Sequence, residues 1–211
     1  MVALVVVEGG KIRRVVCVNN ALKQDQNRLK LFKRYGYDIP RARRFILTRA
    51  KISGGRILEV GTGRGHMAVE LAKNGLQVDS VDLDRKAQDA AKLKLKSLKL
   101  DTYVSLKIMN AERLTYKDNS FDQVISVNFI HHAKNPGKCL KEMMRVFKNK
   151  LIIVDLNKRG EKLMEKVHAL DGHIHAASKM SMPGVKAYLE KAGLIVKVYR
   201  DVCQTVIIAA R

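Results

Sequence analysis

A glycine-rich turn after a short apolar run constrains the fold of this chain more than any other feature. Residues 56–60 are mostly apolar, and Gly61, Gly63 and Gly65 follow them in a G-x-G-x-G pattern. Glycine lacks a Cβ atom, so it lets a strand turn sharply into a helix and lets a ligand approach the backbone. Asp82 ends the next apolar run, about twenty residues on, where adenosine-binding sheets carry a carboxylate for the ribose hydroxyls. The pattern predicts an α/β sheet that holds an adenosine-containing cofactor.

The glycine spacing also discriminates between classes of nucleotide site. The dinucleotide fingerprint requires its third glycine where this chain has His66, and no Gly-Lys-Ser/Thr follows as in a P-loop. Glu59 lies two residues before the first glycine, where a carboxylate would repel a pyrophosphate and attract a cationic ligand. Both observations argue against a nicotinamide dehydrogenase, an alternative that preferential binding of NADH would restore.

Four motifs in this order resemble those of the class I S-adenosylmethionine-dependent methyltransferases. They are the glycine turn with Glu59, residues 78–84, residues 110–112 and residues 121–132. The resemblance is good over about residues 50–155, loose in the C-terminal third and nearly absent in the first fifty residues. Relatives usually carry an acidic residue where this chain has Asn110, whose carbonyl can still accept from the adenine amino group. The resemblance implies S-adenosylmethionine as cofactor, bound by Glu59, Gly61, Thr62, Gly63, Gly65, Asp82, Leu83, Asn110, Ala111, Glu112 and Asn128.

Candidate catalytic residues follow the fourth and fifth predicted strands. Methyl transfer mainly requires alignment of donor and acceptor, and a general base is needed only if the acceptor must lose a proton. His131 and His132 follow the fourth strand, and Asp155 lies at the tip of the fifth, so these three residues are the predicted catalytic group. A further cluster of His168, His173 and His175 could recognise substrate or act as a base. No H-E-x-x-H spacing occurs, so we expect no metal.

The remaining pattern predicts a doubly wound, mostly parallel, seven-stranded α/β sheet. Two β-branched runs around Gly9 and Gly10 predict an N-terminal β-hairpin. We expect residues 51–211 to form the cofactor-binding domain. Residues 1–50 are expected to form an extension or lid on it, not an independent domain. The hairpin strands are predicted at 2–7 and 12–18; helices at 21–35, 41–51, 65–74, 86–99, 137–148, 160–170 and 183–192; and sheet strands at 56–60, 77–81, 104–108, 123–128, 151–155, 194–199 and 205–209.

The charge of the chain leaves two classes of partner open. The chain of 211 residues has 41 Lys and Arg against 20 Asp and Glu, a net charge of +21. Such an excess attracts polyanions such as RNA or anionic substrates, although it can equally be a solvated surface. Enzymes that methylate exocyclic base amines commonly carry two prolines after the position of Asn128, and this chain has none there. A small-molecule acceptor is therefore preferred over RNA.

Two alternatives to a small-molecule enzyme remain. In the first, the enzyme methylates RNA, and basic side chains at 33, 34, 41, 43 and 44 steer the phosphate backbone. In the second, the chain is a basic nucleic-acid-binding protein with a vestigial cofactor pocket.

Three widely spaced cysteines suggest neither a disulfide framework nor a zinc site, so a reducing cytoplasm is expected. No segment approaches membrane-spanning length, and the run at 2–7 is too short for a signal-peptide core.

Overall fold

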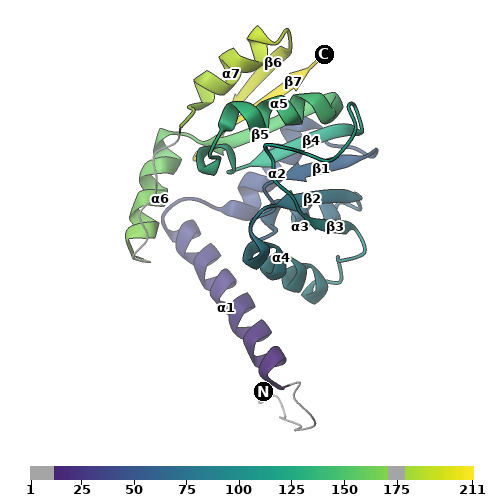
Figure 1. Cartoon of the computed structure of the whole chain (residues 1–211). Helices are drawn as coiled ribbons and strands as arrows, with labels where there is room; N and C mark the ends of the chain where they lie inside the picture. The colour runs from purple at the N-terminus through teal and green to yellow at the C-terminus, as the bar shows by residue number, and fades with distance from the viewer. Residues whose placement is uncertain (1–11, 171–178) are drawn as a thin grey trace.

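Seven strands form one sheet in the computed structural model, which describes residues 12–170 and 179–211. The first five strands are parallel, and β7 enters antiparallel between β5 and β6 (Figure 1). The predicted doubly wound sheet is therefore confirmed, with each strand within a few residues of its predicted position. The strands are β1 (Ile57–Val60), β2 (Val78–Asp82), β3 (Val104–Ile108), β4 (Phe121–Val127), β5 (Phe147–Leu156), β6 (Ile195–Arg200) and β7 (Gln204–Ala210), in the order β3-β2-β1-β4-β5-β7-β6.

Helices cover both faces of this sheet, as parallel strands require. The helices are α1 (Ile12–Arg34), α2 (Ile39–Ala50), α3 (His66–Lys73), α4 (Arg85–Ser97), α5 (Pro136–Val146), α6 (Lys158–Leu170) and α7 (Met182–Lys191), and a 3-10 turn, η1, spans Ile130–His132. The segment 92–100, in which apolar and lysine residues partly alternate, is helical up to Ser97, as its crossover position predicts. None of the described helices combines the length and apolar character needed to span a membrane.

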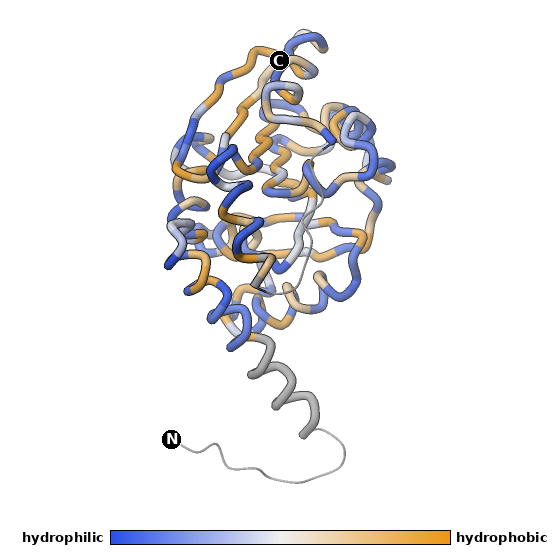
Figure 2. Tube along the Cα trace, turned by 90° about the vertical axis from the view of Figure 1, so that its left-hand side faces the viewer, coloured by the Kyte–Doolittle hydropathy of each residue, from blue (hydrophilic) through white to orange (hydrophobic). Residues whose placement is uncertain are grey.

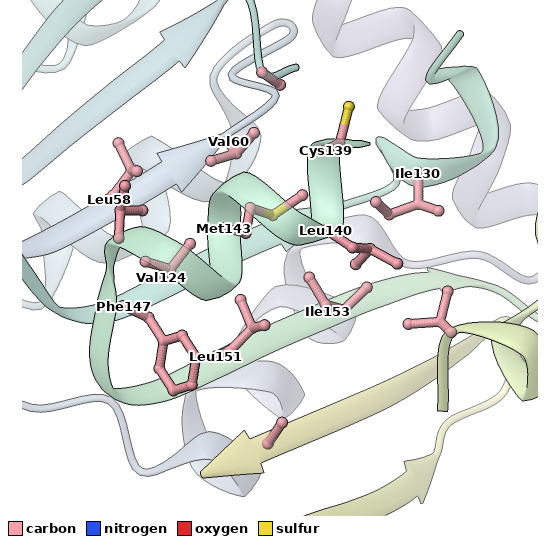
Figure 3. Packing of buried hydrophobic residues seen from close by; sticks show 14 of the residues in the cluster. Leu58, Val60, Val124, Ile130, Cys139, Leu140, Met143, Phe147, Leu151 and Ile153 are labelled. Carbon is pink, nitrogen blue, oxygen red and sulfur yellow. The ribbon is translucent and has the colours of Figure 1, made fainter. Parts of the chain in front are cut away.

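The alternation of side chains along β1 divides the core between the two faces. Leu58 and Val60 point to one face and pack in a cluster with Leu140 and Met143 of α5 (Figure 3). Ile57 points to the other face, where helices α2 and α3 supply the packing partners. Figure 2 shows the apolar strands passing through the middle of the molecule, with mixed polar and apolar helices around them. Glu59 shares the face of Ile57, so β1 directs a carboxylate toward α2 and α3.

The predicted N-terminal hairpin is wrong where the structure can test it. Residues 12–18 belong to α1, which continues without a break into the segment predicted to be helical from residue 21. Their β-branched side chains favour a strand only weakly, because strand preference depends on a paired, half-buried surface. A helix satisfies its own backbone hydrogen bonds and needs no such partner. The other predicted strand, 2–7, lies outside the described residues.

Candidate cofactor and active site

The glycine turn after β1 is held against the end of β2. The amides of Gly61 and Thr62 both donate to the carbonyl of Val81, at 2.8 and 3.2 Å. Gly61 has φ +89°, and a Cβ atom there would lie 2.7 Å from Cβ of Phe129. Only glycine allows this positive φ and this close approach without strain. The turn is therefore fixed at its first glycine by steric contact.

The second glycine of the turn borders open space. A Cβ atom built on Gly63 would meet nothing within 4 Å, and its amide donates to Oδ2 of Asp82 at 2.7 Å. The other oxygen of Asp82 accepts from the amide of Asp84 at 3.0 Å. Asp84 in turn caps α4 by accepting from the amide of Lys86 at 2.8 Å. Gly63 and Asp82 thus form a cradle whose backbone a ligand can approach, next to a partly buried carboxylate.

Glu59 is the start of a buried polar network. Its carboxylate accepts from Oγ of Ser80, the residue beside it on β2, and Ser80 also bonds Thr62 Oγ1 at 2.6 Å. Gln88 Nε2 then donates to Thr62 Oγ1 at 3.0 Å. Glu59 is only 1% exposed, and this burial raises its pKa to about 8, against the opposing effects of the Ser80 hydrogen bond and the charge of Arg43. The carboxyl group is therefore mostly protonated at neutral pH.

The residues predicted to surround adenine lie beside Asp82 at the ends of β2 and β3. The amide of Met109 donates to the carbonyl of Asp82 at 3.0 Å, which brings the following segment to the same edge of the sheet. Asn110 Oδ1 accepts from the amide of Glu112 at 2.9 Å, so it stabilises its own turn. Both carboxylate oxygens of Glu112 accept from Asn135 Nδ2, at 2.9 and 2.8 Å. Leu83 is 65% exposed, which leaves an apolar side chain available to cover a flat ring.

A histidine–carboxylate pair follows β4. Nδ1 of His131 bonds Oδ1 of Asp155, and the amide of His131 donates to Oδ2 at 3.0 Å. The amide of Leu156 also donates to Oδ1, at 2.8 Å. Because a carboxylate only accepts, the proton of a neutral imidazole here lies on Nδ1 and the lone pair on Nε2. The exposed ring of His132 lies against that of His131, with ring centres 3.9 Å apart.

A cleft of about 240 Å³ is lined by about half of the predicted site residues. The predicted residues that line it are Glu59, Gly61, Thr62, Gly63, Asn128, His131 and His132. Asp82 and Asp155 do not line it but bond directly to residues that do. Gly65 is the N-cap residue of α3, and a Cβ atom there would lie 2.9 Å from Cβ of Ala91 on α4. The adenine-side residues Leu83, Asn110, Ala111 and Glu112 do not line the cleft.

Sequence reasoning missed the side chains that complete the cleft from the first fifty residues. Tyr37, Arg43 and Asp25 all line it, although the sequence predicted only a basic extension here. A signal was present in the helix pattern. Arg43 shares the buried face of α2 with Ile39 and Ile46, and Asp25 shares that of α1 with apolar residues one turn away. A charged residue on an apolar helix face is a candidate site residue.

Asp25 ties α1 to the helices beside the glycine turn. Its carboxylate lies 2.8 Å from Lys94 Nζ on α4, 3.5 Å from His66 Nε2 on α3 and 4.0 Å from Arg64 Nη1. Burial and the neighbouring Lys94 lower the pKa of His66 to about 3, so its ring is neutral. The residue that breaks the dinucleotide spacing therefore packs against α1 and Lys94. Asp25, the single acid among these four side chains, balances the charge of Lys94.

The side chains of the remaining histidine cluster lie outside the part of the chain that the structure describes. His173 and His175 lie outside the described residues, and His168 belongs to α6 but its side chain is outside them too. Within 12–170 and 179–211, no group of three His, Cys, Asp or Glu side chains is arranged to hold a metal ion. The role of this cluster stays a prediction.

Comparisons with known proteins agree with the geometry. A family model described as a methyltransferase domain matches residues 58–154. Methyltransferase GfsG of Streptomyces halstedii is 28% identical over 158 residues, which cover 72% of this chain and 57% of the relative. A ubiquinone/menaquinone biosynthesis C-methyltransferase, UbiE of Geotalea uraniireducens, is 30% identical over 110 residues, covering 50% and 47% of the two chains. The chain thus spans about half the length of the curated relatives it matches.

Solved structures share the fold over nearly the whole chain. The crystal structure of an S-adenosylmethionine-dependent methyltransferase from Aquifex aeolicus superposes with a TM-score of 0.65 at 22% identity, covering 91% of this chain and 97% of that one. The open backbone at Gly63, next to the carboxylate of Asp82, fits an adenosine cofactor. Residues 58–154 thus match a methyltransferase domain, and nearly the whole chain has the fold of an S-adenosylmethionine-dependent methyltransferase.

Proposed function

We propose that this protein transfers a methyl group from S-adenosylmethionine to a small-molecule acceptor bound in the cleft. The observation that carries the proposal is the cradle of Gly63 and Asp82, which leaves backbone open beside a carboxylate at the end of the next strand. The named activities of GfsG and UbiE, which are methyltransferases, support the same reaction. A small acceptor suits the cleft of about 240 Å³ that extends from this cradle.

In this proposal the cofactor is held from β1, β2 and β3. Asp82 accepts from the ribose hydroxyls, the turn at Gly61–Gly65 faces the amino-acid end, and residues 110–112 with Leu83 enclose the adenine. Glu59 supplies negative charge near the cationic end once it ionises. When bound, S-adenosylmethionine supplies a methyl group activated by its positive sulfur. The protein then needs to align the acceptor and exclude water.

We infer that His131 is the group that removes a proton from the acceptor where one must leave. Its lone pair is on Nε2, because Nδ1 donates to Asp155, and both His131 and His132 line the cleft. Asp155 accepts one hydrogen bond from the ring and one from the backbone amide of His131, and it stabilises the imidazolium that forms after proton transfer. His132 lies at the exposed side of this ring and orients the acceptor.

Residues 1–50 are proposed to act as an extension of the domain at 51–211, closing one side of the cleft. The support is that three of its residues line the cleft: Asp25 of α1, Tyr37 of the turn after α1, and Arg43 of α2. Cys139 and Cys203 are buried free thiols, which supports the cytoplasmic location expected from the sequence.

The cradle can be tested by filling it. Replacing Gly63 with Leu puts a side chain into open space, so it should block the cofactor without a clash inside the protein. Gly75→Leu is the matched control, because Gly75 also has positive φ and open space but lies outside the cleft. Binding of S-adenosylhomocysteine, measured by calorimetry, should be lost in Gly63→Leu and kept in Gly75→Leu. Equal binding by both variants would disprove this location of the cofactor.

A specific surface feature favours RNA as a second candidate acceptor. Tyr35, which is 44% exposed, lines a surface pocket together with four exposed basic residues of α6, Lys158, Arg159, Lys162 and Lys166. Cations that follow a backbone beside an aromatic ring are typical of single-strand contacts. If RNA binds there, its affinity should fall with salt at a slope of about −0.7 per phosphate engaged, and the double variant Lys162→Gln, Lys166→Gln should reduce that slope. A salt-independent affinity would exclude this candidate.

A further inference from the structure

The charges that line the cleft are unbalanced toward the positive. Arg28, Arg43 and Arg64 line it, and their acidic counterparts there are Asp25 and Glu59. Asp25 already lies 2.8 Å from Lys94, and Glu59 has its pKa raised to about 8 by burial. Asp25 also lies 4.0 Å from Arg64, and neither acid lies within ion-pair distance of Arg43. The cofactor would add one more positive charge, because its ammonium and carboxylate cancel and its sulfur remains cationic.

Arg43 is the member of this set that is most deeply buried and least well paired. It is 6% exposed, and its Nη1 donates to Tyr37 Oη and Gln204 Oε1 at 3.4 Å each, long distances to two neutral groups. Its Nε is buried without a hydrogen-bond partner. No carboxylate of the described residues lies within ion-pair distance of it. A buried guanidinium with five N–H donors is strongly stabilised by a carboxylate or phosphate, so this one has capacity for an anion.

Asn128 extends this polar wall to the end of β4. Its Nδ2 donates to Tyr37 Oη at 3.2 Å, whereas its Oδ1 is buried without a hydrogen-bond partner. Asn128 also has φ +54°, a backbone conformation that costs free energy and persists where the surrounding structure holds it. The carbonyl oxygen can accept from an N–H or O–H of a ligand. Arg43, Tyr37 and Asn128 therefore present an anion site and an acceptor atom within one hydrogen-bonded row.

The row lies on the half of the sheet opposite the residues predicted to bind ribose and adenine, although it includes Asn128, which the sequence assigned to the cofactor. Gln204, which bonds both Arg43 and Tyr37, belongs to β7, and Asn128 follows β4. Asp82 and Asn110 follow β2 and β3, at the other end of the strand order. A ligand group bound by this row is thus displaced from the ribose end of the cofactor, across β1 and β4.

We infer that the methyl acceptor is an anion, with a carboxylate or phosphate bound by Arg43 and a neighbouring N–H or O–H donated to Asn128. This inference rests on the proposed methyl transfer and names the chemical class of its second substrate. The acidic group neutralises the positive charges of Arg43 and of the cofactor sulfur. It also fixes the orientation of the acceptor, since a guanidinium binds both oxygens of such a group in one plane.

The experiment compares Arg43→Met and Arg43→Lys with Arg49→Met. Arg49 is an exposed arginine of the same helix, which lies over Phe45 and Tyr199 and outside the cleft, so it controls for loss of one charge. Thermal unfolding of each variant checks that it is folded. Inorganic phosphate and acetate are then titrated by calorimetry into protein saturated with S-adenosylhomocysteine. Arg43→Met should weaken the binding of at least one anion tenfold or more, Arg43→Lys should weaken it less, and Arg49→Met should leave it unchanged.

The binding of the cofactor product itself separates two sources of the anion. S-adenosylhomocysteine has an amino-acid carboxylate, whereas 5′-methylthioadenosine lacks it. We expect all variants to bind both compounds like the wild type. If Arg43→Met weakens only S-adenosylhomocysteine tenfold, Arg43 binds the cofactor carboxylate and the inference is overturned. It is also overturned if neither anion binds the wild type, or if Arg43→Met has no effect. If S-adenosylhomocysteine fails to bind the wild type, the proposed function fails, and anion titration of the protein alone still tests Arg43.

Discussion

The raised pKa of Glu59 predicts that the stability of this protein falls as the pH rises. The pKa of Glu59 is about 8 in the folded protein and 4.5 without its burial. The folded state therefore holds a proton that the unfolded state has lost, and stability decreases with rising pH between these values. Over the full interval the free energy of unfolding falls by at most about 5 kcal/mol, because each unit of pKa shift corresponds to about 1.36 kcal/mol. The penalty is absent below about pH 4.5 and complete above about pH 8.

Glu59→Gln removes this penalty while keeping the shape of the side chain and a carbonyl oxygen for Ser80. The variant should be several kcal/mol more stable than the wild type at pH 9 and within about 1 kcal/mol of it at pH 5. Urea unfolding followed by circular dichroism at pH 5, 7 and 9 measures this difference. Glu70→Gln, on the partly exposed side of α3, serves as the control and should keep the wild-type pH dependence. Parallel pH profiles for the wild type and Glu59→Gln would refute the reasoning.

Three further predictions concern the cofactor site, the histidine–carboxylate pair and the packing of α6. Asp82→Ala should weaken S-adenosylhomocysteine binding by about 1–3 kcal/mol in calorimetry, because it strands buried hydroxyl partners, and Asp82→Asn should lose less; unchanged affinity would remove Asp82 from the site. Asp155→Asn should lower kcat with little change in S-adenosylhomocysteine affinity and should alter the pH profile of turnover, because the His131 proton is no longer fixed; an unaltered profile would exclude the pair from proton transfer. Gly160→Ala should destabilise the protein by about 1–3 kcal/mol in urea unfolding, since its Cβ would lie 2.1 Å from the Cys203 carbonyl oxygen, and wild-type stability would contradict this packing.

Local pattern was sufficient to predict the sheet and the cradle. The period of apolar residues identifies the parallel strands, and the glycines with Asp82 mark the place where the first crossover begins. These signals are local because each arises within a single strand–turn–helix unit. The order of the motifs along the chain was enough to bring Glu59 and His131 to one cleft, since parallel strands end at a common edge.

Features that depend on distant partners could not be predicted in this way. The partners of Arg43 include Gln204, a residue 161 positions away, and no local pattern relates them. The pair of Asp25 and Lys94 likewise depends on how α1 lies against α4. The strand expected at 12–18 failed for the same reason, because β-branched residues indicate a strand only where another strand is available to pair with it. Tertiary context decided each of these cases.

The hydrogen bond between Gly63 and Asp82 has a thermodynamic consequence for affinity. A flexible segment that becomes ordered upon binding loses about 1–2 kcal/mol of conformational freedom per residue. Here the carboxylate already restrains the segment, so an incoming nucleoside meets a surface that is organised in advance. In the proposed binding mode the same acid contributes in two ways, once by accepting from the sugar and once by sparing the protein the entropic loss of ordering its own backbone.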